Sequence, residues 1–232
     1  MKILSLDTTA EVCTAALCDG NKLVAEMTVN TGNTHSQTLL PVIEQILKIS
    51  ETSIDDIDAF ACSTGPGSFT GVRIGVSTVK GIAYGKGKPC VSVSTLEALA
   101  YNLNGFDGII CPVMNARRNQ VYNALFECRG GELTRLCADR ALSIDELDEE
   151  LSCQSSPVYL VGDGYDITFN GFKKTKPCYV PERYRVQSAY SVARCALKKF
   201  ETGQKLTDWE LVPIYLRPSQ AERERNERLG IK

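Results

Sequence analysis

Two runs of three predicted strands, each followed by helices, restrict the fold of this chain more than any other feature of its sequence. In the first run, alternating apolar residues on either side of Asp19-Gly20-Asn21 predict a hairpin, preceded by a short apolar strand. The predicted elements of this first unit are strands over residues 3–6, 12–17, 23–29, 59–62 and 90–93 and helices over residues 36–49, 71–84 and 94–101. This order predicts a mixed sheet combined with helices.

A second unit begins after Asn104-Gly105 and opens in the same way. Its predicted elements are strands over residues 109–114, 120–128, 132–138 and 158–161 and helices over residues 143–151 and 186–200. The repetition is architectural, because the two halves share little residue identity. The sequence therefore predicts two lobes, residues 1–104 and residues 105–232, and leaves open whether the last helix crosses back to the first lobe.

This duplicated order resembles that of the actin, sugar-kinase and heat-shock ATPase superfamily, which implies a two-lobed α/β fold. In that superfamily the first hairpin of each half supplies a phosphate loop with an acidic residue that holds water or Mg²⁺. The first loop here offers Asp7, but Thr8 and Thr9 stand where a glycine is usual. The second loop has Asn115 at the carboxylate position, and an amide neither acts as a base nor neutralises the charge of a metal. We therefore do not expect a working ATPase site.

A glycine- and proline-rich turn over residues 63–71 joins a predicted buried strand to a helix. Such a turn adopts backbone angles that side chains forbid, and the N–H groups of the following helix can bind an anion. The turn lacks the Gly-Lys-Ser/Thr ending of a P-loop and misses the dinucleotide-binding spacing by one residue. A phosphate cradle and a plain turn with Thr70 as N-cap both remain open. No cofactor is required, and the candidates for weak nucleotide binding are Asp7, Thr8, Gly65, Gly67 and Ser68.

Glycines recur at four-residue spacing in the helix after this turn, as Gly71 with Gly75 and Gly81 with Gly85. Each costs about 1 kcal/mol relative to alanine in a helix interior, so close packing must offset them. The packing partner is either this chain itself or another protein. The helix over residues 36–49 has a broad apolar surface that suits both. The candidates for a partner interface are His35, Leu39, Ile43, Gly71, Val72, Gly75, Val76 and Val79.

The charge of the chain gives no general reason to expect nucleic-acid binding. Its formal net charge is −2, so any RNA contact needs a local basic patch. Direct tRNA binding by Arg117, Arg118 and the tail over residues 217–228 is one interpretation. Because glutamates alternate with the arginines of the tail, a solvated helical tail is the preferred one.

The cysteine and histidine content narrows the chemistry further. Ten cysteines without any C-x-x-C pair predict free thiols. The only histidine, His35, rules out a two-histidine metal site, so neither catalytic residues nor metal ligands are predicted. No apolar run approaches the roughly 20 residues of a membrane span, and no signal peptide is evident. We therefore expect a cytoplasmic protein that does not contact the membrane.

Six motifs, spread over almost the whole chain, together resemble the TsaB (YeaZ) family. They are Ile3-Leu4-Ser5-Leu6-Asp7-Thr8-Thr9, His35-Ser36-Gln37, the segment 63–75, Asn115-Ala116-Arg117-Arg118, Val161-Gly162-Asp163-Gly164 and Pro213-Ile214-Tyr215-Leu216-Arg217. The resemblance implies a noncatalytic subunit of the complex that adds threonylcarbamoyl to N6 of the tRNA adenosine beside the anticodon. It also implies a TsaD-like catalytic paralogue, bound through a helical bundle, and a TsaE-like ATPase as partners. A homodimer in the absence of that paralogue, and contact with tRNA only through the partners, are further implications.

Two enzyme classes stand as alternatives to such a scaffold. One is an ATPase or small-molecule kinase that uses Asp7 with the loop Gly65–Gly71. Its turnover should be lost in Asp7→Ala. The other is a glycoprotease-like peptidase, which lacks the H-E-x-x-H ligands and would have to depend on His35 alone.

Overall fold

A five-stranded mixed sheet forms the first lobe of the molecule. The computed structural model describes residues 1–217, 225 and 228 of the chain. The strand order is β3-β2-β1-β4-β5, in which β1, β2 and β3 are antiparallel and β4 and β5 run parallel to β1. The strands are β1 (Lys2–Asp7), β2 (Cys13–Asp19), β3 (Lys22–Val29), β4 (Ala59–Ser63) and β5 (Cys90–Val93). All five strands predicted for the first unit are confirmed.

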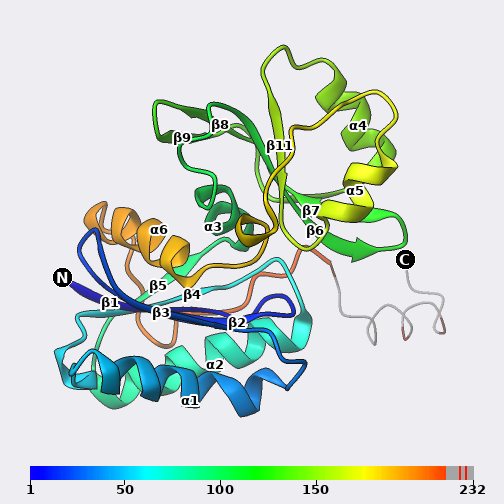
Figure 1. Cartoon of the computed structure of the whole chain (residues 1–232). Helices are drawn as coiled ribbons and strands as arrows, with labels where there is room; N and C mark the ends of the chain where they lie inside the picture. The colour runs from blue at the N-terminus through cyan, green and yellow to red at the C-terminus, as the bar shows by residue number, and fades with distance from the viewer. Residues whose placement is uncertain (218–224, 226–227, 229–232) are drawn as a thin grey trace.

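Helices cover both faces of this sheet (Figure 1). α1 (His35–Ile49) and α2 (Phe69–Lys86) lie on one face, below the sheet in the figure, with a short helix, η1 (Ile54–Asp56), after α1. Their inward residues, such as Leu39 and Val72, join Leu4 and Leu6 in one core. Because the second lobe lies on the opposite side of the sheet, the outer surface of α1 and α2 points away from that lobe.

The opposite face of the first sheet is covered by α6 (Ala189–Glu201). Val192 and Ala196 of this helix pack with Ile3 of β1, and Ser5 donates a hydrogen bond to the carbonyl of Ala189 at 2.7 Å. The prediction that residues 105–232 form one C-terminal lobe is therefore wrong for this helix. The apolar side of α6 packs against apolar residues of the first sheet, and their contact excludes water from both surfaces.

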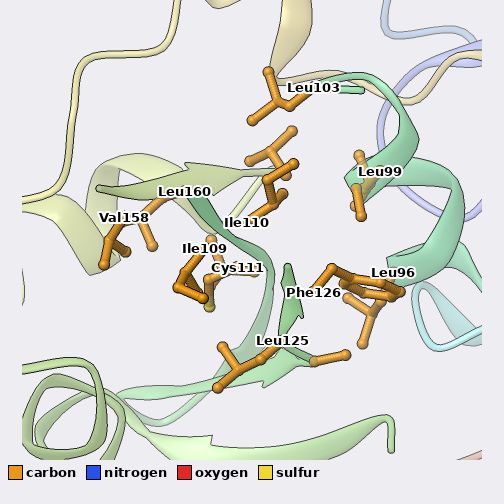
Figure 2. Close-up of a cluster of buried hydrophobic side chains, with 14 of the residues drawn as sticks. Leu96, Leu99, Leu103, Ile109, Ile110, Cys111, Leu125, Phe126, Val158 and Leu160 are labelled. Atoms are coloured by element: carbon orange, nitrogen blue, oxygen red, sulfur yellow. The ribbon is translucent and has the colours of Figure 1, made fainter. Parts of the chain in front are cut away.

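The second lobe is built around the long strand β6 (Gly108–Arg117). It pairs with β8 (Phe126–Arg129), β11 (Val158–Val161) and β7 (Gln120–Asn123), and the outer strands are β9 (Glu132–Arg135) and β10 (Arg140–Ser143). The remaining elements are α4 (Ile144–Ser152), α5 (Tyr165–Gly171) and the short helix η2 (Glu182–Tyr184). In Figure 2, Leu96 and Leu99 of α3 (Thr95–Tyr101) point into the core of this lobe beside Ile110 and Phe126. α3 thus connects the two lobes.

The single strand predicted over residues 120–128 is two strands in the structure, β7 and β8. β7 pairs with the end of β6 and with β10, whereas β8 pairs with the beginning of β6 and with β9. The break falls at Ala124 and Leu125, and the N–H of Leu125 donates to Sγ of Cys137 at 3.2 Å. The sequence pattern over residues 120–128 did not predict this break, because periodicity does not show where the pairing partner of a strand changes.

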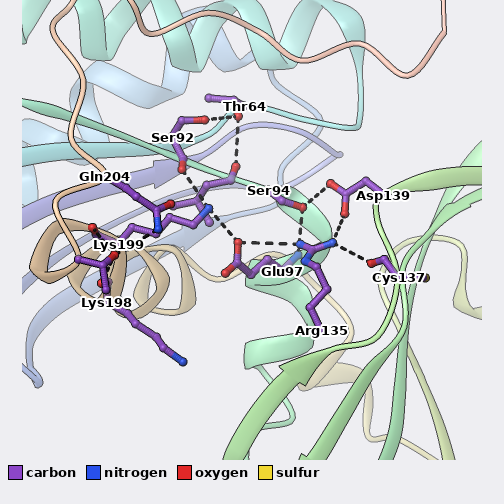
Figure 3. Close-up of polar contacts among 12 residues, drawn as sticks. Thr64, Ser92, Ser94, Glu97, Arg135, Cys137, Asp139, Lys198, Lys199 and Gln204 are labelled. Carbon is purple, nitrogen blue, oxygen red and sulfur yellow. Dashed lines mark hydrogen bonds and ion pairs between the residues drawn. The ribbon is translucent and has the colours of Figure 1, made fainter.

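A polar seam joins the lobes on the side of α3 and α6 (Figure 3). Ser94, the N-cap of α3, donates a hydrogen bond to Asp139 at 2.6 Å, and Asp139 pairs with Arg135 at 2.5 Å. Glu97 pairs with Lys199 of α6 at 2.9 Å and lies 3.9 Å from Arg135. These partly buried contacts hold the second lobe against both helices.

Candidate functional site

The loop after β1 is buried under the start of α2. Asp7 has only 1% of its surface exposed, and its Oδ1 accepts hydrogen bonds from the N–H and Oγ1 of Thr9 at 2.8 and 2.7 Å. Thr8, equally buried, donates from Oγ1 to the carbonyl of Gly71 at 2.7 Å. Burial raises the pKa of Asp7. Thr8 therefore fastens this loop to α2, Asp7 is bonded within the loop, and neither residue lines the interlobe cleft, contrary to the interpretation of a phosphate loop.

The glycine-rich turn after β4 is also filled by the chain itself. At Gly65, where φ is +118°, an added Cβ would lie 2.4 Å from the carbonyl oxygen of Ile214. At Gly67 an added Cβ would lie 2.5 Å from the carbonyl oxygen of Thr9, in the β1–β2 loop. The N-cap of α2 is Ser68, not Thr70. Oγ of Ser68 accepts a hydrogen bond from the N–H of Gly71, in the first helical turn, at 3.3 Å. Of the five residues predicted for nucleotide binding, only Gly67 and Ser68 line the cleft.

Residues 211–217, called the C-terminal strap below, pack across this turn. The N–H of Ile214 donates a hydrogen bond to the carbonyl of Thr64, the residue after β4, at 2.8 Å. The ring of Tyr215 stacks on Phe69 with centroids 4.7 Å apart. Arg73 lies 3.9 Å above the Phe69 ring and donates from Nε to the hydroxyl of Tyr215 at 2.8 Å. The strap therefore connects two of the sequence motifs, segment 63–75 and the motif around Tyr215, although about 140 residues separate them.

A cleft of about 550 Å³ lies between the lobes beside the strap. Arg217 bridges it, because its guanidinium donates a hydrogen bond to Gln120 and lies 5.9 Å from the centroid of the Tyr122 ring. The cleft is lined by Thr9, Ala10, Glu11, Pro66, Gly67, Ser68, Phe69, Thr70, Met114, Asn115, Ala116, Arg117, Tyr122, Asp163, Ile214, Tyr215, Leu216 and Arg217. Its volume falls in the range of sites for small molecules.

Asp163, directly after β11, is the carboxylate that the second lobe contributes to this cleft. Solvent reaches its side chain, but the surrounding protein limits its hydration and raises its pKa to about 6. The backbone N–H groups of Asn115 and Gly164 oppose that shift, and the charge of Glu11 adds to it. Asp163 was not among the site residues predicted from the sequence, although an aspartate between two glycines after a strand was a usable signal.

The hairpin between β6 and β7 carries three successive residues with left-handed backbone: Arg117 (φ +62°), Arg118 (φ +54°) and Asn119 (φ +57°). The side chain of Asn115 accepts the N–H of Arg117 at 2.8 Å. The amide at the expected carboxylate position therefore stabilises a turn. No glycine marks this conformation, so the sequence did not reveal it.

The sequence is similar to those of known proteins over most of its length. The tRNA threonylcarbamoyladenosine biosynthesis protein TsaB of Escherichia coli (strain K12) is 30% identical over 225 residues, which cover 95% of this chain and 96% of that protein. The chain belongs to the TsaB (YeaZ) family. The TsaB of Bacillus subtilis (strain 168) is 34% identical over 70% of this chain and 71% of its own length. This membership associates the chain with tRNA threonylcarbamoyladenosine biosynthesis.

Two further comparisons describe the fold of this TsaB-family chain. The family model for TsaD, tRNA N6-adenosine threonylcarbamoyltransferase, matches residues 27–200. The solved structure of YeaZ from Pseudomonas aeruginosa is 23% identical, covers 93% of this chain and 99% of its own, and superposes with a TM-score of 0.81. The two-lobed α/β fold predicted from the strand order is thereby confirmed.

Most of the residues predicted for a partner interface are buried inside this TsaB-family chain. Leu39 and Ile43 on α1, and Gly71, Val72, Gly75, Val76 and Val79 on α2, all lie within the first lobe. His35 alone is partly exposed, and its Nε2 lies 2.8 Å from the carbonyl oxygen of Ala10. These side chains form the core under the two helices, so a partner cannot contact the buried ones directly.

The opposite surfaces of the same two helices are open. Gly81 and Gly85 are exposed, and an added Cβ at either would meet no atom within 4 Å. Tyr84, next to Gly85 on α2, is 72% exposed, and Leu40 of α1 is also exposed. We call this surface the outer helix face, and it comprises Leu40 and Glu44 of α1 with Ser77, Gly81, Tyr84 and Gly85 of α2.

The described part of the chain holds no group of three residues suited to bind a metal ion. None of its described helices has the length and apolar character of a membrane span. All ten cysteines are free thiols, as predicted. Burial raises the pKa of Cys62, Cys111 and Cys195, which makes these thiols poor nucleophiles.

Proposed function

We propose that this chain is the noncatalytic scaffold of a complex that adds threonylcarbamoyl to N6 of the tRNA adenosine 3′ of the anticodon. In this proposal it binds a TsaD-like catalytic paralogue through the outer helix face and stabilises the active conformation of that subunit. A TsaE-like ATPase joins the complex, and a second copy of this chain occupies the face when the paralogue is absent. The complex acts in the cytoplasm, and the scaffold requires no cofactor.

The observation that carries the proposal is the outer helix face. Gly81 and Gly85 weaken α2 by about 1 kcal/mol each relative to alanine, and no contact within the described chain compensates for them. Exposed glycines on a helix allow the backbone of another helix to approach closely. Tyr84 and Leu40 add apolar surface to this face. A helical bundle with a second protein gives all these residues a role.

The buried loop after β1 also supports a noncatalytic role. In the competing ATPase or kinase, Asp7 would have to reach a bound nucleotide, but its side chain is buried and bonded to Thr9. The backbone around Gly67 and Gly71 is in close contact with the same loop. A phosphate could approach Asp7 only after this loop separated from α2.

Co-expression with the TsaD-like paralogue of the same organism tests the proposal. We expect a stable heteromeric complex by light scattering, and we expect Gly81→Leu/Gly85→Leu to abolish it while the variant remains folded. Buried positions such as Gly75 and Val76 are unsuitable for this test, because their substitution would unfold the first lobe. Lys173→Ala, on an exposed loop of the second lobe, is the matched control. Two proteins that elute separately, each folded, would refute the proposal.

The cleft keeps the enzyme alternative testable. Its volume would accept a mononucleotide, and Asp163 is the acidic side chain of the second lobe that faces it. An enzyme at this position would turn over nucleotide as the isolated chain, and Asp163→Ala would lose that activity. Under the scaffold proposal we expect no turnover by either protein.

A further inference from the structure

We propose that the β6–β7 hairpin and the end of the C-terminal strap bind the sugar–phosphate backbone of single-stranded RNA at the rim of the cleft. The inference rests on the proposed role in tRNA modification and extends it, since the resemblance to the TsaB (YeaZ) family implies contact with tRNA only through partner subunits. Its ligand is a polyanion that bears bases, such as the exposed loop of a tRNA.

The first observation is the backbone of the hairpin. Left-handed conformation is unfavourable for most non-glycine residues, and Arg117, Arg118 and Asn119 adopt it in succession. Glycine would remove that cost at the first two positions. Instead the chain carries two arginines there and holds the turn with Asn115, whose side chain accepts the N–H of Arg117. Strain that is retained and supported in this way is typical of functional positions.

The second observation is the grouping of positive charge. Arg117 and Arg118 are exposed at the end of the hairpin, and Arg217 of the strap lines the same cleft as Arg117. The contacts of Arg217 with Gln120 and Tyr122 bring its guanidinium to the base of that hairpin, where the strap meets β6 and β7 (Figure 1). Arg117 and Arg217, 100 positions apart in the sequence, thus line one cleft, with the exposed Arg118 next to Arg117, in a chain whose overall charge is negative. Arginine side chains bind phosphate oxygens with paired hydrogen bonds.

The acidic residues of the cleft favour a ligand on the rim over a free nucleotide inside. Glu11 and Asp163 line the cleft together with Arg117 and Arg217, so the two acidic groups offset the two arginines for a phosphate group placed between the lobes. The arginine hairpin projects from the end of β6 and can contact a backbone that passes outside the cleft. The positive rim therefore suits an extended polyanion.

The third observation is aromatic surface beside the arginines. Tyr215 remains 41% exposed although it stacks on Phe69, and Tyr122 lines the same cleft. Bases of unpaired nucleotides stack on such rings. Guanidinium groups next to accessible tyrosine rings form a combination suited to binding single-stranded RNA.

The salt dependence of tRNA affinity, measured on the complex with the catalytic paralogue, tests the inference. Arg117→Asn/Arg118→Asn removes both charges but retains a residue type that tolerates left-handed backbone. Because each phosphate contact contributes about 0.7 to the slope of log affinity against log salt, we expect this slope to fall by about 1.4. Affinity at about 0.1 M salt should fall roughly tenfold. Arg117→Lys/Arg118→Lys should retain most of the slope.

The control removes two charges from a surface outside the proposed site. Lys173→Ala/Lys174→Ala lies on the second lobe, where both lysines pair with acidic residues of α4, and it should leave the slope unchanged. An intact, folded complex whose slope is the same with and without the two arginines would overturn the inference. So would displacement of tRNA by millimolar AMP, which would indicate a nucleotide pocket.

Failure of the scaffold proposal would be visible separately, as absence of the complex. In that case the same variants are compared in the isolated chain at low salt, where binding that depends on Arg117 and Arg118 supports the inference and its absence overturns it.

Discussion

The two halves of α2 carry the same glycine spacing but face opposite surroundings. In the first half, an added Cβ at Gly71 would lie 2.0 Å from the carbonyl oxygen of Thr8, and at Gly75 2.6 Å from its Oγ1. In the second half, Gly81 and Gly85 meet nothing within 4 Å. One glycine pair is needed for the chain to fold, whereas the other is unexplained until a second protein is present. A glycine pattern in a helix therefore indicates close packing but not the partner in that packing.

The strongest test of this comparison is Gly71→Ala. A methyl group there collides with a backbone carbonyl that cannot move without displacing the loop after β1. We expect a loss of about 3 kcal/mol or more in the free energy of unfolding, measured by urea denaturation. If the variant were as stable as the natural chain, the assignment of this half of α2 to internal packing would be wrong.

The second test concerns affinity for the partner. Gly81→Leu/Gly85→Leu adds two large side chains to an open surface, so stability should change by less than about 1 kcal/mol. Affinity for the TsaD-like paralogue should fall about a hundredfold or more, since the partner helix can no longer approach. Titration calorimetry of the two purified proteins measures the change. Unaltered affinity would remove the second half of α2 from the interface.

A third test separates stability from binding in the second lobe. Asp148 of α4 is buried and accepts backbone N–H bonds from Lys173, Lys174 and Thr175 at 2.7, 3.0 and 2.8 Å. Burial alone would raise the pKa of Asp148, but these three donors outweigh it and hold the pKa at about 2. We expect Asp148→Asn to cost about 2 kcal/mol of stability at pH 7 and to leave partner affinity unchanged.

The pH dependence of that cost follows from the lowered pKa. Because the folded-state pKa of Asp148 lies below its ordinary value of 3.8, the stabilisation is present above about pH 4 and is lost as the pH falls toward 2. Urea denaturation at pH 7 and pH 3 should therefore show the variant and the natural chain converging in acid. A constant difference at both pH values would indicate that charge on Asp148 is not responsible.

The smallest expected effect is a gain. Gly81→Ala adds a methyl group where there is room for it and replaces a poor helix former. The free energy of unfolding should rise by about 0.5–1 kcal/mol in urea denaturation, with Gly71→Ala as the matched opposite. A destabilised Gly81→Ala would mean that this half of α2 is packed against something within the chain.

Local patterns predicted most of the fold because they reflect periodicity and turn chemistry. The hairpin at Asp19-Gly20-Asn21 and the strand before the glycine-rich turn appear where alternation and turn residues placed them. The same patterns failed at residues 120–128, where strand partners change without any turn residue between β7 and β8. They also suggested Thr70 as the N-cap of α2, whereas the N-cap is Ser68. Both residues carry a hydroxyl group, so the N-cap pattern fits either of them.

The candidate site was predicted less completely, because its residues come together only in the folded chain. The glycine-rich turn was recognised, but the sequence did not show that the carbonyl of Ile214 packs against Gly65. Asp7 ends a strand, as expected, yet the start of α2 covers it. Arg73 lies in a recognised motif, but its contact with Tyr215 spans 142 residues of sequence.

The sequence by itself determined the two-lobed order of strands and helices, the thiol state of the cysteines and the membership of the TsaB (YeaZ) family. These depend on residue type and on spacing within about ten residues, and both are visible in the sequence alone. Only the tertiary structure decided which glycines of α2 are buried, that α6 returns to the first sheet and that the C-terminal strap closes the turn after β4. Those outcomes depend on which distant apolar surfaces exclude water together, and a linear pattern does not state which surface meets which.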